Sequence, residues 1–446
     1  MATYLTFTQG TPTSNKKFTF STWLKRGDIG TDNVPFYCGS GSELDLGFMF
    51  SDAGPGNIRA NWDATASEWL VTNRVFRDPG AWYHIVFAVD TSLASSGDRL
   101  RLYINGVEET SFSSESQPSQ DATSAALASG QLITLGRNEY SDAKYFRGAM
   151  AHTHFIDGLQ YAPTVFGETD STSGIWVPIS APSVTYGNNG FFLKYASGAL
   201  GTDSSGNGNN LVASGTMTPT KDNAMNNFAT LNPVENYYNG ATFSNGNNTV
   251  GASGSNYSWN GSTFIMTTGK WYFEVLPGAA VDMMIGISGN QPVSSTQVLG
   301  NKLYQWGFNS DNGKYQNNAV DSSAYSDTWD SGDYMGVYLD LDNNKLYLGK
   351  NGTIQNSGTG VSITAPSAFT GNNYGGYVFA VGDYTTSSGT FECNFGNGYF
   401  GTTAISGAVA DAGGEGQFKY NPSTGTFDGS SKDFRALCTN NLATYG

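Results

Sequence analysis

The chain has 446 residues, enough for two or three domains that each bury a core without disulfide or metal support. Gly (57), Tyr (25) and Phe (27) are abundant, while charged residues make up only 13% of the chain, a composition that favours half-buried strands and tight turns over disorder. The formal net charge of -15, without any Lys/Arg cluster, argues against a nucleic-acid-binding protein.

The cysteines and the N-terminus bear on where the protein folds. Cys38, Cys393 and Cys438 are too few, and odd in number, for a disulfide framework, so we expect all three to be reduced. Met1 to Leu5 include no basic segment before an apolar run, which predicts synthesis in the cytoplasm of the producing cell without a signal peptide. No stretch approaches the roughly 18 apolar residues of a membrane span, so we expect no membrane insertion.

Short alternating segments predict antiparallel strands along most of the chain. Residues 99–104 place Leu100, Leu102 and Ile104 on one face, and Asn105-Gly106 follows as a type I′ hairpin signal because both positions require positive φ. Phe391, Cys393 and Phe395 share a face in the same way, which predicts Cys393 in a core. The other predicted strands are residues 18–24, 82–89, 271–275, 304–308, 337–341, 345–348, 377–381 and 391–395.

Two parts of the chain lack this alternation. Residues 166–225 are rich in turn residues, but Phe191, Phe192 and Tyr195 argue against a free linker and predict a connector that packs on a domain. Residues 401–446 begin Gly- and Ala-rich and end in two short aromatic runs, which predicts a closing strand or a contact segment. Many short strands with frequent turns indicate an all-β fold of several domains.

Several segments resemble the strands of two known domain families. The first 165 residues resemble laminin-G-like, concanavalin-A-like sandwiches at residues 18–24 (FTFSTWL), 82–86 (WYHIV), 102–106 (LYING), 133–137 (ITLGR), 146–148 (FRG) and 155–157 (FID). Residues 226–400 resemble a SPRY domain at residues 269–275 (GKWYFEV), 285–287 (IGI), 332–333 (GD), 340–343 (DLDN), 349–352 (GKNG) and 391–396 (FECNFG).

These resemblances imply two antiparallel β-sandwich (jelly-roll) domains in series. The expected organisation is a laminin-G-like sandwich at 1–165, a turn-rich packed connector at 166–225, a SPRY-like sandwich at 226–400 and a C-terminal closing or contact segment at 401–446.

A further set of segments is similar to segments that recur together in tail-fibre-like virion proteins of marine bacteriophages. They lie at residues 155–158, 166–168, 176–178, 187–191, 203–207, 228–233, 418–420 and 434–440. This resemblance implies a non-enzymatic virion component on the exposed surface, as a tail fibre, appendage or capsid fibre, that binds a host-surface glycan or protein. The alternative is a structural or decorating virion protein, and in both cases other virion proteins and further copies of the chain are expected partners.

A third hypothesis, a polysaccharide depolymerase, depends on a pair of carboxylates. Laminarinase-type enzymes share the concanavalin-A-like sandwich and carry E-x-D-x-x-E on one strand, with the two catalytic carboxyl groups about 5.5 Å apart. Glu43 and Asp45 begin this pattern, but Phe48 replaces the second Glu. No convincing Ser/His/Asp set offers a nucleophile instead, so we predict a protein that is not an enzyme.

Two short patterns are candidate metal sites. Asp203, Ser205 and Asn207, followed by Gly208, match positions 1, 3, 5 and 6 of a calcium loop, although Ser214 stands where the bidentate Glu belongs. The alternative is a connector rich in Asx turns. His152 and His154 would share a strand face and hold a metal if a third ligand joined them, and otherwise form a polar face under the connector.

Ligand binding would use aromatic residues in loops with polar neighbours. Sugars offer apolar faces for stacking and hydroxyls for hydrogen bonds, and the polar, aromatic stretch 309–330 falls in a region where SPRY domains carry binding loops. The alternative for each ring is packing at the rim of a sandwich. The candidate ligand-binding residues are Trp69, Trp259, Asn309, Asp311, Tyr315, Tyr325 and Trp329.

Overall fold

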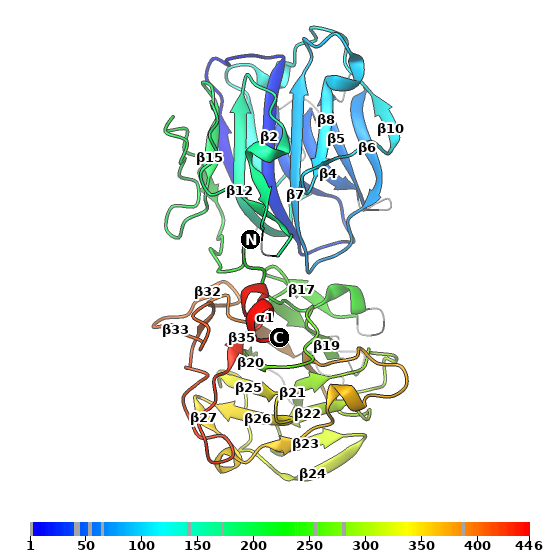
Figure 1. The fold of residues 1–446 in the computed structure, drawn as a ribbon, viewed down its shortest axis with the longest axis vertical. Helices are drawn as coiled ribbons and strands as arrows, with labels where there is room; N and C mark the ends of the chain where they lie inside the picture. The colour runs from blue at the N-terminus through cyan, green and yellow to red at the C-terminus, as the bar shows by residue number, and fades with distance from the viewer. Residues whose placement is uncertain are drawn as a thin grey trace. The chain divides into compact units, whose positions relative to one another are not determined.

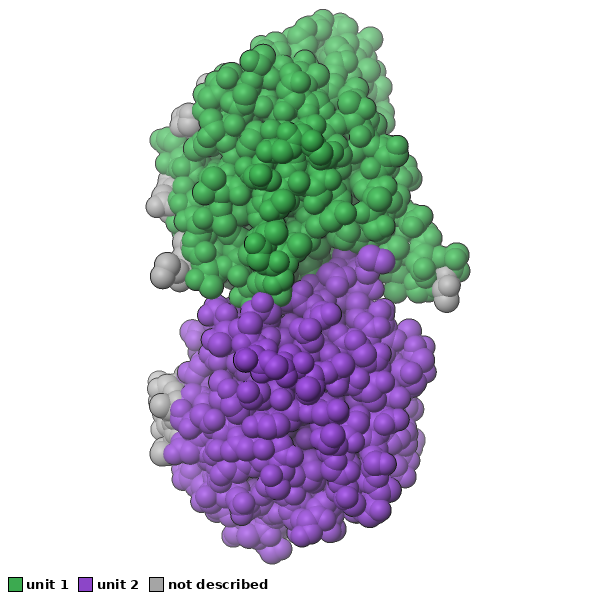
Figure 2. Space-filling view, turned by 90° about the vertical axis from the view of Figure 1, so that its left-hand side faces the viewer, with its two compact units in different colours: residues 1–219 green, residues 220–446 purple. Residues whose placement is uncertain are grey.

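The computed structural model describes residues 3–39, 45–51, 56–63, 67–140, 144–171, 173–236, 238, 240–252, 257, 259–278, 282–384 and 389–446. The chain divides into two compact units, Met1–Pro219 and Thr220–Gly446, each with its own hydrophobic core (Figures 1 and 2). Strands dominate both units, and the all-β fold class is confirmed. Within the described ranges, α1 (Thr439–Tyr445) is the only α-helix, and no helix there has the length and apolar character to cross a membrane.

The strands of the first unit, as far as it is described, are β1 (Tyr4–Thr8), β2 (Lys17–Arg26), β3 (Asn33–Cys38), β4 (Leu46–Ser51), β5 (Asn57–Asp63), β6 (Glu68–Val75), β7 (Trp82–Asp90), β8 (Leu100–Ile104), β9 (Val107–Glu108), β10 (Phe112–Ser116), β11 (Leu132–Leu135), β12 (Gly148–Asp157), β13 (Gly167–Thr169), β14 (Trp176–Pro178), β15 (Phe191–Leu193) and β16 (Val212–Ser214). They form an eight-stranded sheet, β10-β6-β5-β4-β3-β11-β1-β16, a six-stranded sheet, β15-β12-β2-β7-β8-β9, and the hairpin β13-β14. Short 3-10 turns lie at η1 (Ser96–Asp98), η2 (Ala125–Leu127) and η3 (Pro163–Val165).

The core of this unit lies between its two large sheets. Phe20 on β2 and Phe36 on β3 stack with ring centroids 3.9 Å apart, so the two sheets pack face to face as in a sandwich. The predicted hairpin is confirmed, since Asn105 and Gly106 join β8 to β9 with φ of 50° and 81°.

The turn-rich stretch after residue 165 adds strands to this sandwich. β15 pairs with β12 at the edge of the six-stranded sheet, and β16 pairs with β1 at the edge of the eight-stranded sheet. Residues up to Pro219 therefore fold as part of the first unit.

The strands of the second unit, over its described residues, are β17 (Thr242–Ser244), β18 (Thr249–Gly251), β19 (Trp259–Gly261), β20 (Lys270–Pro277), β21 (Met283–Ser288), β22 (Gln305–Asn309), β23 (Lys314–Asn317), β24 (Val320–Ala324), β25 (Met335–Asp340), β26 (Lys345–Lys350), β27 (Thr353–Ile354), β28 (Val361–Ser362), β29 (Val378–Asp383), β30 (Thr390–Asn394), β31 (Tyr399–Phe400), β32 (Thr403–Ala404), β33 (Val409–Ala410), β34 (Gln417–Phe418) and β35 (Arg435–Ala436). One sheet runs β17-β18-β30-β20-β25-β26-β27, with β28 beside β26 and β35 beside β20. The other runs β19-β29-β21-β22-β23-β24. Short 3-10 turns lie at η4 (Pro233–Glu235), η5 (Asn356–Gly358) and η6 (Pro366–Ala368).

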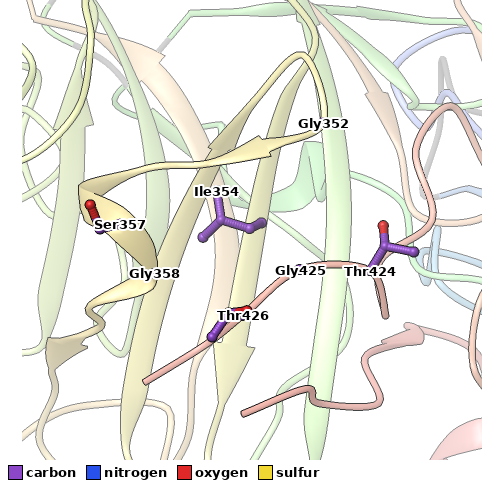
Figure 3. A pocket seen from close by; sticks show the side chains of 7 residues that line it. All are labelled: Gly352, Ile354, Ser357, Gly358, Thr424, Gly425 and Thr426. Carbon is purple, nitrogen blue, oxygen red and sulfur yellow. The ribbon is translucent and has the colours of Figure 1, made fainter. Parts of the chain in front are cut away.

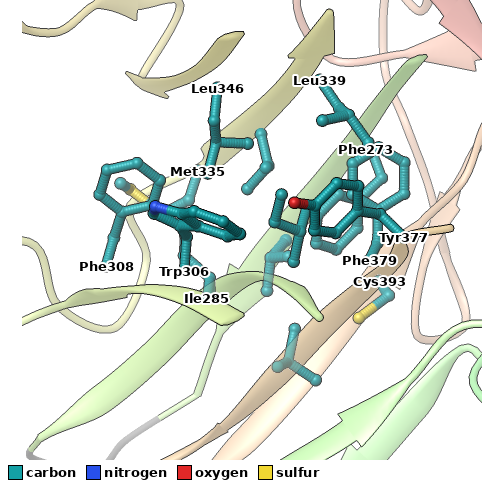
Figure 4. Packing of buried hydrophobic residues seen from close by; sticks show 14 of the residues in the cluster. Phe273, Ile285, Trp306, Phe308, Met335, Leu339, Leu346, Tyr377, Phe379 and Cys393 are labelled. Atoms are coloured by element: carbon teal, nitrogen blue, oxygen red, sulfur yellow. The ribbon is translucent and has the colours of Figure 1, made fainter. Parts of the chain in front are cut away.

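Aromatic side chains from both sheets fill the core of the second unit (Figure 4). Phe273 on β20 lies 4.4 Å, between ring centroids, from Phe379 on β29 of the opposite sheet. Cys393 is fully buried in the same core, as its strand pattern predicts. Cys38 and Cys438 are also buried, and none of the three cysteines forms a disulfide.

The C-terminal segment covers the outer face of the β20-β25-β26 sheet. Side chains alternate along a strand, so the residues next to the core positions of these strands point away from the core. There they meet rings of the C-terminal segment, and a second cluster of buried residues results. Its aromatic members are Phe228, Tyr272, Tyr338, Tyr347, Phe418, Phe427 and Phe434.

Glu274 fastens this segment to the sheet. Its carboxylate is 1% exposed and accepts hydrogen bonds from the backbone N–H of Lys419 and of Tyr420, both at 2.8 Å. Burial raises the pKa of Glu274 to about 7, against the opposing effect of these bonds and those from Asn394 and Tyr272. The rings of Phe418, Phe427 and Phe434 thus lie in a buried cluster of the unit and not in an exposed apolar patch, and a homo-oligomer remains a prediction.

Candidate binding site

An open cleft of about 340 Å³ lies in the second unit, where strands β22, β25 and β26 meet their loops. Two of its residues follow β22, Lys350 ends β26, and the others precede β25. Because β25 and β26 pair antiparallel, the start of one strand lies beside the end of the other. This surface, here called the acidic cleft, is lined by Ser310, Asp311, Thr328, Trp329, Asp330, Asp333 and Lys350.

Hydrogen bonds hold the loop that forms one wall of the acidic cleft. The backbone N–H of Trp329 donates to the carbonyl oxygen of Ser310 at 3.1 Å. The Lys350 ammonium donates to the Thr328 carbonyl oxygen at 2.7 Å and lies 3.1 Å from an Asp333 carboxylate oxygen. Since the chain's own groups make these contacts, the concave surface exists before a ligand arrives.

The acidic cleft has a surplus of negative charge. Asp311, Asp330 and Asp333 line it with Lys350 as the single cation, and that cation is already paired with Asp333. Burial raises the pKa of Asp333, but hydrogen bonds from Asn351, the Asp330 backbone and Lys350 outweigh burial and lower it below its usual value. Asp333 is therefore ionised at neutral pH.

Asp282 contacts Asp311 at the edge of the cleft. The backbone N–H of Asp282 donates to Asp311 Oδ1 at 3.1 Å. Burial, and then the hydrogen bond and charge of Asp311, raise the pKa of Asp282. Such a site stabilises a ligand that brings a positive group or hydroxyl donors, and it repels phosphate and carboxylate groups.

The structure brings two of the predicted ligand residues, Asp311 and Trp329, into the acidic cleft. Asn309 lies behind them, 4% exposed, with its Oδ1 accepting the backbone N–H of Asp311 at 2.9 Å. Trp329 is 3% exposed and its indole N–H has no acceptor among the described residues. Its ring is part of the cleft wall and does not offer an open face for stacking.

Tyr315 and Tyr325 lie outside the cleft lining. Their rings are 6.0 Å apart and both pack edge-on or tilted against Phe308, at 6.1 and 5.2 Å between centroids. The hydroxyl of Tyr325, which is 8% exposed, donates to the Thr359 carbonyl oxygen at 2.9 Å. These contacts fit the alternative for both rings, which is packing at the rim of the sandwich.

Trp259 is not an exposed ring, and the expectation of a stacking platform at this position is wrong. It is 1% exposed and packs with Met284, Leu299 and Ala380 on the second unit's other sheet. Residues 259–261 form strand β19 beside β29, so the side chain is covered by the unit itself.

Trp69 lies in the first unit, on β6, and is half-buried. The Arg59 guanidinium covers its ring at 4.2 Å, and its indole N–H donates to Ser114 Oγ at 3.0 Å. Arg59, Trp69 and Ser114 come from the neighbouring strands β5, β6 and β10. One face of this ring is therefore occupied by a cation, and its N–H is already used.

A second open groove, of about 400 Å³, lies in the second unit between η5 and the C-terminal segment (Figure 3). It offers backbone groups, hydroxyls and one aliphatic side chain, and no charged group lines it. The lining residues are Gly352, Ile354, Ser357, Gly358, Thr424, Gly425 and Thr426. The acidic cleft, with its fixed charges, is the more selective of the two sites.

The predicted calcium loop is a hydrogen-bonded turn. The Asp203 carboxylate accepts the backbone N–H groups of Phe192, Ser205 and Asn209 at 2.8 to 2.9 Å, and also the Ser205 hydroxyl. The Asn207 amide donates to the carbonyl oxygens of Gly187 and Gly190. A calcium ion would have to displace these donors, because it needs free oxygen lone pairs.

We expect calcium removal to leave the first unit unchanged, since Asp203 already has four donors. Addition of a chelator, or of millimolar calcium, should shift the midpoint of thermal unfolding by less than about 1 °C. Calcium-dependent stabilisation that disappears in Asp203→Asn would contradict this expectation and support the calcium loop. Asp121→Asn, which removes the same charge from an exposed site of the same unit, is the matched control.

Ser21 and His84 lie within hydrogen-bond distance of each other, but the direction of their hydrogen bond does not suit a catalytic dyad. Ser21 Oγ lies 2.9 Å from His84 Nε2, and the indole N–H of Trp176 lies 2.9 Å from His84 Nδ1. An indole N–H can only donate, so Nδ1 is the acceptor and Nε2 carries the proton. His84 therefore donates to Ser21 and cannot take its proton.

The glycosidase pattern and the histidine pair are the two remaining candidate sites. Phe48 is fully buried in the core of the first unit, where a catalytic carboxylate has no access to substrate. Glu43 lies outside the described residues. His152 and His154 lie near the connector, and no group of three or more His, Cys, Asp or Glu side chains suited to a metal occurs in the described part of the chain.

Lys350 and Asp333 were missed as site residues, although the sequence carries a signal for them. Asp333 lies shortly before the predicted strand 337–341 and Lys350 shortly after the predicted strand 345–348, so antiparallel pairing of these strands places both residues at the same end. The sequence signal for a cleft of this kind is a pair of charged residues at the open end of a hairpin, close to a polar, aromatic loop.

Family comparisons agree with both resemblances. Residues 2–165 match the family described as the concanavalin A-like lectin/glucanases superfamily (Laminin_G_3), and residues 270–380 match the SPRY domain. No curated protein matches the chain.

Solved structures with similar folds include the SPRY domain of human HERC1, at 15% identity over 36% of this chain and 96% of that chain, with a TM-score of 0.30. The TRIM65 PSpry domain matches at 16% identity over 37% of this chain and 91% of that one, with a TM-score of 0.29. The stonustoxin structure matches at 18% identity over 37% of this chain, with a TM-score of 0.29, and the match spans 27% of the toxin chain. Domains of the two matched families typically bind other molecules. The two family matches thus place a concanavalin A-like domain at residues 2–165 and a SPRY domain at residues 270–380 of the chain, in series.

Proposed function

We propose that the protein is a non-enzymatic component of a bacteriophage virion that binds a host-surface glycan or protein. The observation that carries the binding role is the acidic cleft, a preformed concave site at the loop end of a binding-type domain. The virion setting rests on the segments that resemble tail-fibre-like proteins of marine phages.

Many weak contacts are sufficient for such a role. A virion presents multiple copies of one component, and linked sites bind a surface far more tightly than one site alone. An open cleft of this size, with carboxylates that accept hydrogen bonds from hydroxyl or ammonium groups, suits shallow recognition of a sugar or of a basic side chain.

The acidic cleft should decide binding to the host. Purified protein is expected to bind cells of the bacterium that the phage infects and, in excess, to reduce phage adsorption. The double variant Asp311→Asn/Asp330→Asn should lose about tenfold or more in cell binding, because hydrogen bonds to charged groups contribute about 1.5–3 kcal/mol. Flow cytometry with labelled protein measures this directly.

The matched control is Asp321→Asn/Glu108→Gln, which removes the same charge from exposed positions outside the cleft. It should bind cells as the unmodified protein does. If the unmodified protein neither binds cells nor competes with phage, the alternative of a decorating virion protein replaces the receptor-binding proposal. Binding that survives in the cleft variant would move the site elsewhere on the chain.

A further inference from the structure

All three histidines of the chain lie in the first unit, where two of them contact the segment from Trp176 to Tyr186. Trp176 donates its indole N–H to His84 Nδ1 at 2.9 Å. The Tyr186 hydroxyl is hydrogen bonded to His154 Nδ1 at 3.0 Å. This segment, here called the strap, is thus held at both ends by an imidazole of the six-stranded sheet.

The Trp176 ring occupies a narrow slot. A Cβ added at Gly106 would come within 2.9 Å of the indole, and one added at Gly167 within 2.6 Å. Val184 and Tyr186 of the strap pack, beside Tyr161, Val165 and Phe166, on apolar residues of the outer face of the sheet, which include Val86, Ala88 and Ile156. Release of the strap would expose part of this face to water.

The Trp176 contact requires a neutral imidazole. His84 donates from Nε2 to Ser21 Oγ, so the only nitrogen that can gain a proton is Nδ1. Protonation there would set an N–H against the Trp176 N–H and remove the bond. The Tyr186 hydroxyl can donate to or accept from His154 Nδ1, so at His154 burial is what disfavours the charged ring: His154 is fully buried, and its Nε2 has no hydrogen-bond partner among the described residues.

The surroundings also oppose positive charge. His154 stacks on Phe192 at 4.0 Å, and Lys194 lies 5.3 Å from the same ring. The charged or titratable groups that act on His84 and His154 are Lys194, His152 and each other. The hydroxyl of half-buried Tyr186 also faces His154. Within the described residues, no carboxylate pairs with any of the histidines.

We propose that the strap Trp176–Tyr186 is an acid-released cover of the six-stranded sheet, which neutral His84 and His154 hold in place and which opens when they are protonated. The device is independent of the proposed receptor-binding role. It gives the first unit a second state in which an apolar surface is available.

The direction of the pH effect follows from the two states. Burial, and then the charge of His152, lower the pKa of His84 to about 3, and burial lowers the pKa of His154 and His152 as well. A released histidine titrates near its ordinary value of about 6.5. The stability that the neutral imidazoles give to the docked strap is therefore present above about pH 6.5 and is lost as the pH falls below it. Each histidine that gains a proton on release raises the equilibrium constant for strap release by up to about tenfold for each pH unit of acidification.

Hydrogen exchange at pH 7.5, 6.5, 5.5 and 4.5, corrected for intrinsic exchange rates, tests the proposal. The strap amides should lose protection as the pH falls, by more than tenfold per pH unit below 6, while amides of β3 to β5 stay protected. The second unit contains no histidine, so its amides in the same sample report general effects of acid.

Substitutions identify the groups responsible. In His84→Asn the amide oxygen accepts the Trp176 N–H but does not titrate. The rise in strap exchange for each pH unit of acidification should therefore be about tenfold smaller than in the unmodified protein. Trp176→Phe keeps a ring in the slot without the hydrogen bond, and should expose the strap at pH 7.5. Equal strap protection at pH 4.5 and 7.5, simultaneous exchange of strap and β3 to β5, or an unchanged slope in His84→Asn would each overturn the proposal.

Discussion

Deletion of residues 401–446 is expected to abolish cooperative unfolding of the second unit. The deletion would expose the rings of Tyr272, Tyr338 and Tyr347, which are at most 1% exposed in the intact chain. It would also remove two of the backbone N–H donors of the buried Glu274 carboxylate. Exposing a large apolar side chain costs about 1.5–3 kcal/mol, so several rings together approach the whole stability of an ordinary domain. Calorimetry and binding of a hydrophobic dye measure the loss.

A single substitution in the intact chain tests the loss of ring packing without the loss of chain segment that the deletion also causes. Phe427 lies 5.1 Å, between ring centroids, from both Tyr338 and Tyr347. Phe427→Ala should cost about 3–5 kcal/mol of unfolding free energy, whereas Tyr445→Ala, at a side chain 43% exposed, should cost less than about 1 kcal/mol. If the deletion and Phe427→Ala both left the unfolding transition unchanged, residues 401–446 would be an appendage and not part of the core.

Phe48→Glu is expected to unfold the first unit without creating a glycosidase. The Phe48 ring is fully buried, 5.8 Å from Phe20 and 6.4 Å from Phe50 between centroids. An unpaired carboxylate at this position loses the ring's contacts and has no donor, which together cost more than about 4 kcal/mol. Urea unfolding followed by near-ultraviolet circular dichroism measures the change.

Phe48→Leu is the control for the loss of the ring alone, with an expected cost of about 1–1.5 kcal/mol. Reducing sugar released from host polysaccharide is the second measurement, and neither variant should release any. A folded Phe48→Glu protein that cleaves polysaccharide would contradict this expectation and revive the depolymerase hypothesis.

In the first unit, polar residues that resemble a metal site in the sequence are used for hydrogen bonds within the fold. Asp203, Ser205 and Asn207 match a calcium loop by spacing, but spacing does not show which groups face the carboxylate. In the folded chain, backbone N–H groups from β15 and from the turn itself occupy it. The loop ties residues 203–209 to β15, and both lie within the connector.

Local pattern was sufficient for the strands, the Asn105-Gly106 turn and the burial of Cys393, because alternation and turn chemistry depend on neighbours in sequence. The resemblances to the two families also follow from short motifs within single strands. The acidic cleft required the fold, since Asp311, Trp329 and Lys350 come from different strands and loops. Trp259 shows the same limit, because nothing near it in sequence reveals that Met284 and Leu299 cover its ring.

The sequence by itself determined an all-β chain with a concanavalin A-like domain, a SPRY domain and three reduced cysteines. Only the tertiary structure decided which polar residues are open and which are already hydrogen bonded. The pairing of His84 with Trp176 and the burial of Phe48 could not be read from spacing, because both depend on contacts between segments far apart in the chain.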